Sequence, residues 1–367
     1  LEFPSLSPVL NYCDNRALRE EIYTAHCTRA SQQGPNAGEW DNSELITETL
    51  ELRHQLAQLL GFEHYADLSL ATKMADSPDS VRRFLDELAE KSLPQARREW
   101  TELEAYAKQE DGLESLEAWD INYYSEKLRE ARYQVSQEDI RPYLPVDRVL
   151  PGLFEVVRRL YGLEVREVEK FDRYHCDVQL FEVLAEDKVI ACFYLDLYAR
   201  AHKRGGAWMS QFRGQSNLGS NIRPIIVNCC NFAKASPCLL GLDEVATLFH
   251  ELGHGLHGLL SQVRYPSQAG TSVKQDFVEL PSQIFEHWAT EPEVLKRYAR
   301  HYETGQVISD ALIEKIRASS TFNQGFQTSE YLAAAYLDLA WHEQAPDAAA
   351  GVKALEATEM DRIGLPM

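Results

Sequence analysis

Residues 243–262 read DEVATLFHELGHGLHGLLSQ, a stretch in which apolar residues and histidines recur at helical spacing. At about 100° of rotation per residue, the apolar side chains gather on one face of a helix and the histidines on the opposite face. The apolar face consists of Val245, Leu248, Phe249, Leu252 and Leu256. The pattern predicts an amphipathic helix from about Asp243, the expected N-cap, to about Gln262, with its apolar face in a core.

The polar face of this predicted helix carries His250, His254 and His257, with Glu251 beside them. His-Glu-x-x-His on a helix places two imidazoles one turn apart, where both can bind one zinc ion while the glutamate acts on a zinc-bound water. In a 367-residue chain with 11 histidines, this pattern is expected by chance about 0.03 times. We expect His257 to pack or to contact a ligand residue, because three neighbouring positions on one helix rarely converge on one ion.

A third zinc ligand is expected as well, since a catalytic zinc ion usually has three protein ligands and one open position. Leu260 stands where a further histidine of the same helix segment would fall, so a carboxylate later in the chain is the alternative. Residues 276–288, DFVELPSQIFEHW, offer Asp276, Glu279 and Glu286. Asp276 and Glu279 have the spacing of a helix capping box, and Glu286 lies about two turns after Glu279 on a shared face. One carboxylate can bind zinc while another holds a ligand histidine, and the spacing leaves the choice open.

Several motifs occur together in this chain. HELGH at 250–254 is followed 25 residues later (279 − 254) by Glu279 within DFVELPSQ; FYLDLY lies at 193–198, KRGGAWM at 203–209 and Asn15-Arg16 near the start. Together they resemble the thimet oligopeptidase family of zinc metallopeptidases, which has bacterial members of the oligopeptidase A and peptidyl-dipeptidase types. The resemblance covers most of the chain. It implies that His250, His254 and Glu279 bind one Zn²⁺ ion per chain and that Glu251 is the general base.

The partner of a ligand histidine is a separate expectation. Metal-bound imidazoles usually donate their other N–H to a carboxylate or a backbone carbonyl. Glu286 is the candidate for His250 or His254, because it follows Glu279 on the same helical face.

The rest of the chain predicts a mainly α protein with a small β-sheet. Amphipathic helices are expected at 42–60, at 80–106 with an interruption at Pro94, and at 151–161 with Gly162 closing the last one. Strands are expected at 178–184 and 189–198, joined as a hairpin across Glu186-Asp187-Lys188, and at 224–230. The resemblance implies a zincin-type catalytic region and two helical lobes flanking a deep channel. We divide the chain into a helical region, 1–170, that forms part of the channel wall, and a zinc-binding catalytic region, 171–367.

The resemblance implies a metallopeptidase that hydrolyses short oligopeptides with a zinc-activated water. One alternative is a peptidyl-dipeptidase, which releases dipeptides from C-termini by the same chemistry. A second is a catalytically incomplete zinc-binding fragment, because the family's downstream Tyr- and Gly-rich segment, which stabilises the oxyanion, does not occur before Met367; Tyr331 and Tyr336 lie in a helical context and are not assigned that role. A structural zinc site is a third alternative, and it would require four protein ligands.

The composition of the chain limits the classes of partner that it is expected to bind. The net charge of −20 argues against nucleic acid and anionic membrane surfaces, both of which would repel the protein. The sequence contains neither an 18-residue apolar run nor a recognisable signal peptide. The family resemblance implies a cytoplasmic location and short peptides as partners. The seven cysteines match no zinc module, and Cys229 and Cys230 are expected as reduced core residues. We assign no oligomeric state.

Overall fold

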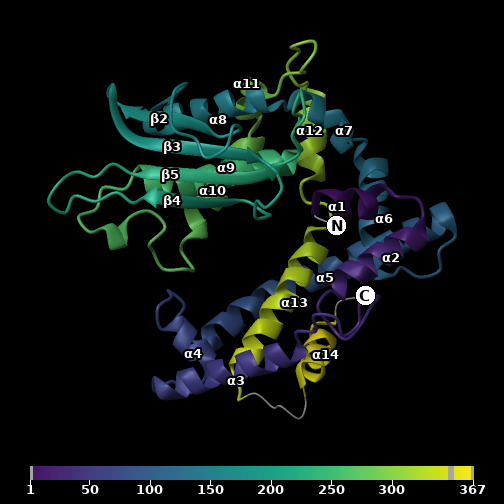
Figure 1. Ribbon diagram of the computed structural model, residues 1–367. Coiled ribbons are helices and arrows are strands. Elements are labelled where there is room, and N and C mark those ends of the chain that lie inside the picture. Colours follow the sequence, from purple (N-terminus) through teal and green to yellow (C-terminus); the bar gives the residue numbers. More distant parts are fainter. Residues whose placement is uncertain (1–2, 346–350, 365–367) are drawn as a thin grey trace. The chain divides into compact units, whose positions relative to one another are not determined.

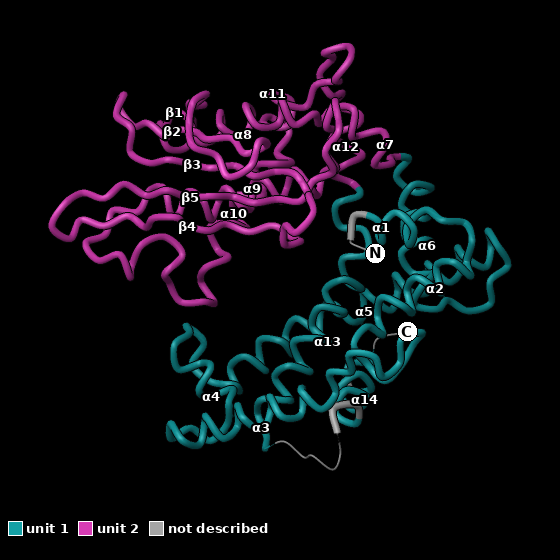
Figure 2. The backbone as a smooth tube through the Cα atoms, viewed as in Figure 1, with its two compact units in different colours: residues 1–134, 319–367 teal, residues 135–318 magenta. Residues whose placement is uncertain are grey.

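The computed structural model of the chain describes residues 3–345 and 351–364. Helices dominate in these ranges and the named strands form one five-stranded sheet, so the predicted fold class, mainly α with a small sheet, is confirmed. Two compact units divide the chain: residues 1–134 with 319–367, and residues 135–318 (Figure 2). The division at residue 170 is a different one and stays a prediction. None of the helices in the described ranges is both long and apolar enough to cross a membrane.

The first unit is helical throughout its regular elements (Figure 1). Its helices are α1 (Phe3–Tyr12), α2 (Arg16–Cys27), α3 (Ser43–Leu59), α4 (Tyr65–Leu70), α5 (Pro78–Asp111), α6 (Ala118–Tyr133), α13 (Gln324–His342) and α14 (Gly351–Ile363). Helix α3 lies where a helix was predicted at 42–60.

The core of this unit joins segments that are far apart in the sequence. Helix α13 packs along α5, with the rings of Trp100 and Phe326 stacked at 5.9 Å. The Glu99 carboxylate accepts backbone N–H groups of Gly325 at 3.3 Å and Phe326 at 2.8 Å. Because the first N–H groups of a helix have no partner within it, Glu99 caps α13 from within α5.

Two prolines lie inside helices, although the sequence predicted an interruption at one of them and the start of a helix at the other. Pro94 lies within the continuous α5, and Pro151 lies within α8 (Val146–Tyr161), so both predicted boundaries are wrong. A proline in a helix deprives the carbonyl four residues earlier of its partner. Those carbonyls belong to Glu90 and Asp147, which are exposed, as both prolines are. Water can replace the lost hydrogen bonds on these exposed faces while the opposite faces pack.

The second unit places helices against the sheet. Its helices are α7 (Gln137–Ile140), η1 (Arg141–Tyr143), α8, α9 (Leu242–Leu259), η2 (Pro266–Gln268), α10 (Glu279–Thr290), α11 (Pro292–Tyr298) and α12 (Asp310–Ser319). Its strands are β1 (Glu164–Glu167), β2 (Gln179–Ala185), β3 (Lys188–Tyr198), β4 (Trp208–Arg213) and β5 (Ile225–Phe232). The strand order is β1-β2-β3-β5-β4, and only the β3–β5 pair among these is parallel. Helix α9 packs on β5 and α10 packs on α9 (Figure 1).

The predicted strands and their hairpin are confirmed. Strands β2, β3 and β5 match the predicted ranges within two residues. The turn between β2 and β3 has positive φ at Glu186 (47°) and Asp187 (61°), which is the conformation of both central residues in a type I′ hairpin turn. Cys229 and Cys230 are buried in β5, and all seven cysteines are free thiols. Strands β1 and β4 were not predicted, since β4 is largely exposed and lacks the alternation of a half-buried strand.

A buried ion cluster joins two further motifs of the family resemblance, FYLDLY at 193–198 and KRGGAWM at 203–209. Asp196, 1% exposed at the end of β3, accepts hydrogen bonds from Arg200 at 2.7 and 2.8 Å and from Lys203 at 2.9 Å. The Lys203 ammonium also donates to the backbone oxygens of Tyr198 and Cys230. Lys203 therefore ties the end of β3 to β5, the strand on which α9 packs.

Candidate metal centre

The helix that carries the histidines begins slightly earlier than the sequence predicted. Gly241 is the N-cap of α9, and its N–H donates to the Glu244 carboxylate at 2.7 Å. The prediction that Asp243 caps the helix is therefore wrong, because Glu244 reaches back over the first turn. The predicted apolar face is confirmed: Val245, Leu248, Phe249, Leu252 and Leu256 are all at most 5% exposed.

Helix α10 approaches α9 closely at one point. A Cβ atom added to Gly253 would lie 2.6 Å from Ser282 Cα and 3.1 Å from the Pro281 carbonyl oxygen, so this approach requires a glycine. The rings of Phe249 and Phe285 lie 5.7 Å apart next to it. The contact brings the first turn of α10, which begins at Glu279, beside the histidine face of α9.

Three of the predicted ligand residues converge at this point. Glu279 Oε2 lies 3.2 Å from His250 Nε2 and 3.1 Å from His254 Nε2. The two imidazole rings are nearly perpendicular, with centroids 4.8 Å apart. Around a tetrahedral ion with ligand distances of about 2.0–2.1 Å, ligand atoms are about 3.3 Å apart. The donor set and its spacing therefore fit a zinc ion with one coordination position left for water or substrate.

The contact between His250 and Glu286 fits the same arrangement. Nδ1 of His250 lies 2.6 Å from Glu286 Oε1, and since a carboxylate only accepts hydrogen bonds, Nδ1 is the donor in this contact. Nε2, on the other side of the ring, faces the Glu279 carboxylate at 3.2 Å. The contact with Glu286 thus orients the ring so that Nε2 points to where an ion would bind.

Glu251 lies next to these residues and is almost completely buried. Its side chain is 5% exposed, and its Oε2 has no hydrogen-bond partner among the described residues. Burial raises the pKa of Glu251 to about 7; His250 opposes this shift and Glu279 adds to it. A carboxyl group with a pKa near neutrality can both accept and return a proton.

The other predicted candidates lie outside the converging set. His257 is not among the three residues whose ligand atoms lie within 4.8 Å of one another, and burial lowers its pKa. Asp276 precedes α10, whose N-cap is Val278 without a side-chain hydrogen bond, so the capping box suggested by the spacing of Asp276 and Glu279 does not form.

His254 belongs to the converging set, and burial lowers its pKa. A lowered pKa favours the neutral imidazole that metals bind.

One residue of the site was missed by the sequence reasoning. Ser282 is fully buried, and its Oγ lies 2.9 Å from Glu279 Oε2 and 2.8 Å from the Glu279 carbonyl oxygen. The i, i+3 spacing between Glu279 and Ser282 was the available signal, because such residues are neighbours on a helix.

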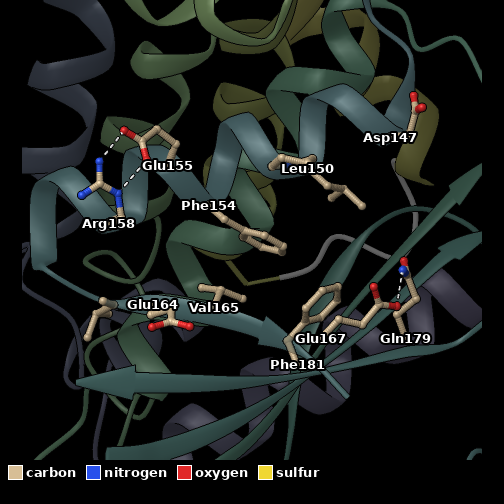
Figure 3. A pocket seen from close by; sticks show the side chains of 12 residues that line it. Asp147, Leu150, Phe154, Glu155, Arg158, Glu164, Val165, Glu167, Gln179 and Phe181 are labelled. Carbon is tan, nitrogen blue, oxygen red and sulfur yellow. Dashed lines mark hydrogen bonds and ion pairs between the residues drawn. The ribbon is translucent and has the colours of Figure 1, made fainter. Parts of the chain in front are cut away.

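Two other features of this unit do not form a competing site. His175, Cys176 and Asp177 group their ligand atoms in one loop, but Asp177 pairs with Lys234 at 2.6 Å, and that ammonium would repel a cation. A cavity of about 530 Å³ lies between α8 and the β1–β2 edge, with Phe154 and Phe181 in its lining (Figure 3). None of the converging residues lines this cavity.

Comparison with known proteins identifies the family. The sequence pattern of peptidase family M3 matches residues 9–362. The chain belongs to peptidase family M3. The family resemblance seen in the sequence is thereby confirmed, and the HELGH motif and Glu279 lie within the matched range.

Curated relatives within this family are similar over nearly the whole chain. Oligopeptidase A of Escherichia coli strain K12 is 48% identical over 364 residues, which cover 97% of this chain and 53% of the relative. Dipeptidyl carboxypeptidase of the same organism is 41% identical over 91% of this chain and 49% of the relative. The chain spans about half the length of the curated relatives it matches.

Solved structures show the same fold at low sequence identity. PZ peptidase A with inhibitor 2 has a TM-score of 0.56 at 15% identity, covering 98% of this chain and 52% of that chain. An oligoendopeptidase F from Bacillus anthracis strain Ames has a TM-score of 0.55 at 14% identity, covering 98% and 54%. The fold of this chain is thus shared by proteins of very different sequence.

Proposed function

We propose that this chain is a zinc-dependent metallopeptidase that hydrolyses peptide bonds of short oligopeptides. The observation that carries the proposal is the convergence of His250, His254 and Glu279 around one point, with the buried Glu251 beside it. The ligand set is open to substrate, since the side chain of Glu279 is 51% exposed and that of His250 24%. A structural zinc site would need a fourth protein ligand, and the cluster among the described residues contains three.

Each residue of the proposed metal centre has a separate role in peptide hydrolysis. His250, His254 and Glu279 would hold the ion, which when bound lowers the pKa of water and polarises a carbonyl group. Glu251 accepts the proton of the attacking water and delivers it to the leaving amine, as a buried carboxylate beside the ion can do. Glu286 keeps the proton of His250 on Nδ1 and so leaves Nε2 free for the ion.

A second candidate function is the release of dipeptides from peptide C-termini. It is favoured by the 41% identity to E. coli dipeptidyl carboxypeptidase, whose name states that activity for that protein. Both candidates use the same metal centre and differ in how the substrate is anchored. Mass spectrometry of a digested ten-residue peptide distinguishes them, because only the first yields internal cleavage without stepwise loss of dipeptides. A channel between two lobes and a cytoplasmic location stay predictions.

The test of the proposal separates metal binding from chemistry. Glu251→Gln keeps the side-chain shape and removes the base, so zinc content should stay near one per chain while peptide cleavage falls by about 10²–10⁴-fold. His254→Ala should lose zinc and cleavage together. His287→Ala is a matched control, because His287 is an exposed histidine of α10 and should retain both.

Three results would count against the proposal. Parental cleavage by the Glu251→Gln protein would refute the role of Glu251 as the general base. Zinc binding that survives His254→Ala would refute the ligand set. Zinc bound at one per chain with no cleavage by the parent would favour a zinc-binding protein without peptidase activity.

A further inference from the structure

Ser282 lies behind the third ligand of the proposed metal centre. Its Oγ is 2.9 Å from Glu279 Oε2, the same oxygen that lies 3.1 Å from His254 Nε2 and 3.2 Å from His250 Nε2. Among the described residues, Ser282 provides the one hydroxyl group that hydrogen-bonds this carboxylate. We propose that the Ser282 hydroxyl is a positioning group that holds the Glu279 carboxylate in the geometry for metal binding. This inference rests on the proposed zinc site.

The Glu279 side chain needs such a partner more than the histidines do. It is 51% exposed, against 24% for His250 and 11% for His254. A glutamate has three rotatable side-chain torsions, and it loses most of that freedom when its carboxylate is fixed. Glu279 is also the first residue of α10, where Val278 provides no side-chain cap. A hydrogen bond to the carboxylate therefore selects one arrangement out of many that solvent would otherwise allow.

Ser282 itself is held in register with the helix that carries both histidines. It is fully buried, and its Cα would lie only 2.6 Å from a Cβ atom on Gly253, which lies between the ligand positions 250 and 254 of α9. The hydroxyl is thus fixed relative to the imidazoles through a backbone contact. The Ser282 hydroxyl can therefore hold the Glu279 carboxylate at a fixed place relative to α9. The Glu279 side chain is half exposed and is not held by packing in this way.

A purely structural role is the competing explanation. Serine hydroxyls inside helices often donate to a backbone carbonyl of the preceding turn, and Ser282 Oγ lies 2.8 Å from the Glu279 carbonyl oxygen. The hydroxyl has one proton for these two acceptors. The two explanations differ in one measurable respect: only a positioning role makes the effect of Ser282 on zinc affinity depend on the Glu279 carboxylate.

A double-mutant cycle on the full chain measures this dependence. The dissociation constant for Zn²⁺ is determined by competition with a chromophoric chelator for the parent, Ser282→Ala, Glu279→Ala and the double variant. Removing a group that orients a metal ligand typically weakens metal binding about 10–100-fold, and we expect at least a tenfold loss for Ser282→Ala. In the Glu279→Ala background the same substitution should have less than a twofold effect, because the carboxylate on which it acts is absent.

Two further variants guard against misreading the cycle. Ser329→Ala removes another fully buried serine hydroxyl, which lies 2.9 Å from the Gly325 carbonyl oxygen in α13, and it should leave zinc affinity unchanged. Ser282→Cys keeps a side chain of similar shape with a weaker donor, so its loss should be intermediate. Circular dichroism confirms that each variant is folded, and the cysteine variant replaces the alanine variant in the cycle if the latter does not fold.

The outcomes are distinct. A Ser282→Ala protein that binds zinc within twofold of the parent, or one that loses the same factor with and without the Glu279 carboxylate, overturns the positioning role and leaves the zinc site intact. A parent chain that binds no zinc overturns the proposed function, and this inference with it.

Discussion

The contact between α9 and α10 makes Gly253→Ala an informative substitution. An added Cβ atom would lie 2.6 Å from Ser282 Cα, 3.1 Å from the Pro281 carbonyl oxygen and 3.2 Å from Phe285 Cβ. Carbon atoms in contact prefer about 3.5–4.0 Å, so the helices must separate by about 1 Å at this point. The two closest of these atoms belong to the backbone of α10 and cannot turn aside as the end of a side chain can.

The effect of Gly253→Ala on the free energy of unfolding has two opposing contributions. Overpacking a close contact destabilises a protein by about 1–3 kcal/mol. Replacing a helical glycine by alanine gains up to about 1 kcal/mol of helix stability. We therefore expect Gly253→Ala to lower the free energy of unfolding by up to about 2 kcal/mol. Because α10 carries Glu279, the same displacement should weaken zinc binding about tenfold or more.

Gly255→Ala is the matched control on the same helix. Its added Cβ atom would meet the side-chain amide of Asn228 at 3.3 Å, and a side chain can give way by a few tenths of an ångström. This variant should be as stable as the parent, or more stable, and should keep its zinc affinity. Urea unfolding and a zinc titration of both variants provide the test. If Gly253→Ala matches Gly255→Ala in both measurements, the close approach does not set the position of Glu279.

Three other perturbations address the ligands, the ion and the buried ion cluster. Glu286→Ala removes the hydrogen bond to His250 Nδ1 and should weaken zinc binding about 10–100-fold in a chelator competition; an unchanged dissociation constant would mean that Glu286 does not orient His250. Removing zinc with a chelator should lower Tm in scanning calorimetry, since a ligand at 100 times its Kd stabilises the folded state by about 2.7 kcal/mol, and an equal Tm with and without zinc would contradict the site. Burial raises the pKa of Asp196, but hydrogen bonds from Arg200 and Lys203 outweigh it and hold that pKa at about 2. Because the folded-state pKa is lowered, this group contributes about 2 kcal/mol of stability above its unfolded pKa of 3.8, and the contribution is lost as the pH falls toward 2. The difference in unfolding free energy between the parent and Asp196→Asn should therefore shrink between pH 5 and pH 2, and a constant difference would show that the carboxylate is not paired in this way.

Local patterns of the sequence were sufficient for much of the fold. The apolar face of α9 could be predicted because helix geometry alone places Val245, Leu248 and Leu252 together. The β2–β3 hairpin could be predicted because two apolar, β-branched runs flank a polar turn. The proline interruptions were wrongly predicted because exposure decides whether water replaces the lost hydrogen bond, and exposure depends on packing with distant helices.

The candidate metal centre could be predicted only in part from such patterns. The spacing of His250 and His254 is fixed within one helix, so their shared face follows from the sequence. The choice of Glu279 over Asp276 or Glu286 depended on the family resemblance, because it is set by the approach of α10 to α9 at Gly253. That approach is a contact between two helices, and no periodicity within either of them encodes it. Ser282 was missed for the same reason.

The division of the first unit into residues 1–134 and 319–367 (Figure 2) has a consequence for the order of events during synthesis. Helix α5 packs against α13, which ends at His342. Trp100 and Glu99 therefore cannot contact Phe326 until residues 135–318 have been translated. At about 5–20 residues per second, the ribosome needs roughly 10–40 s for that interval. The second unit is continuous and can complete its sheet during this time. The early helices, by contrast, leave the ribosome with an unpaired apolar face, and this makes them the segment that a chaperone would have to protect.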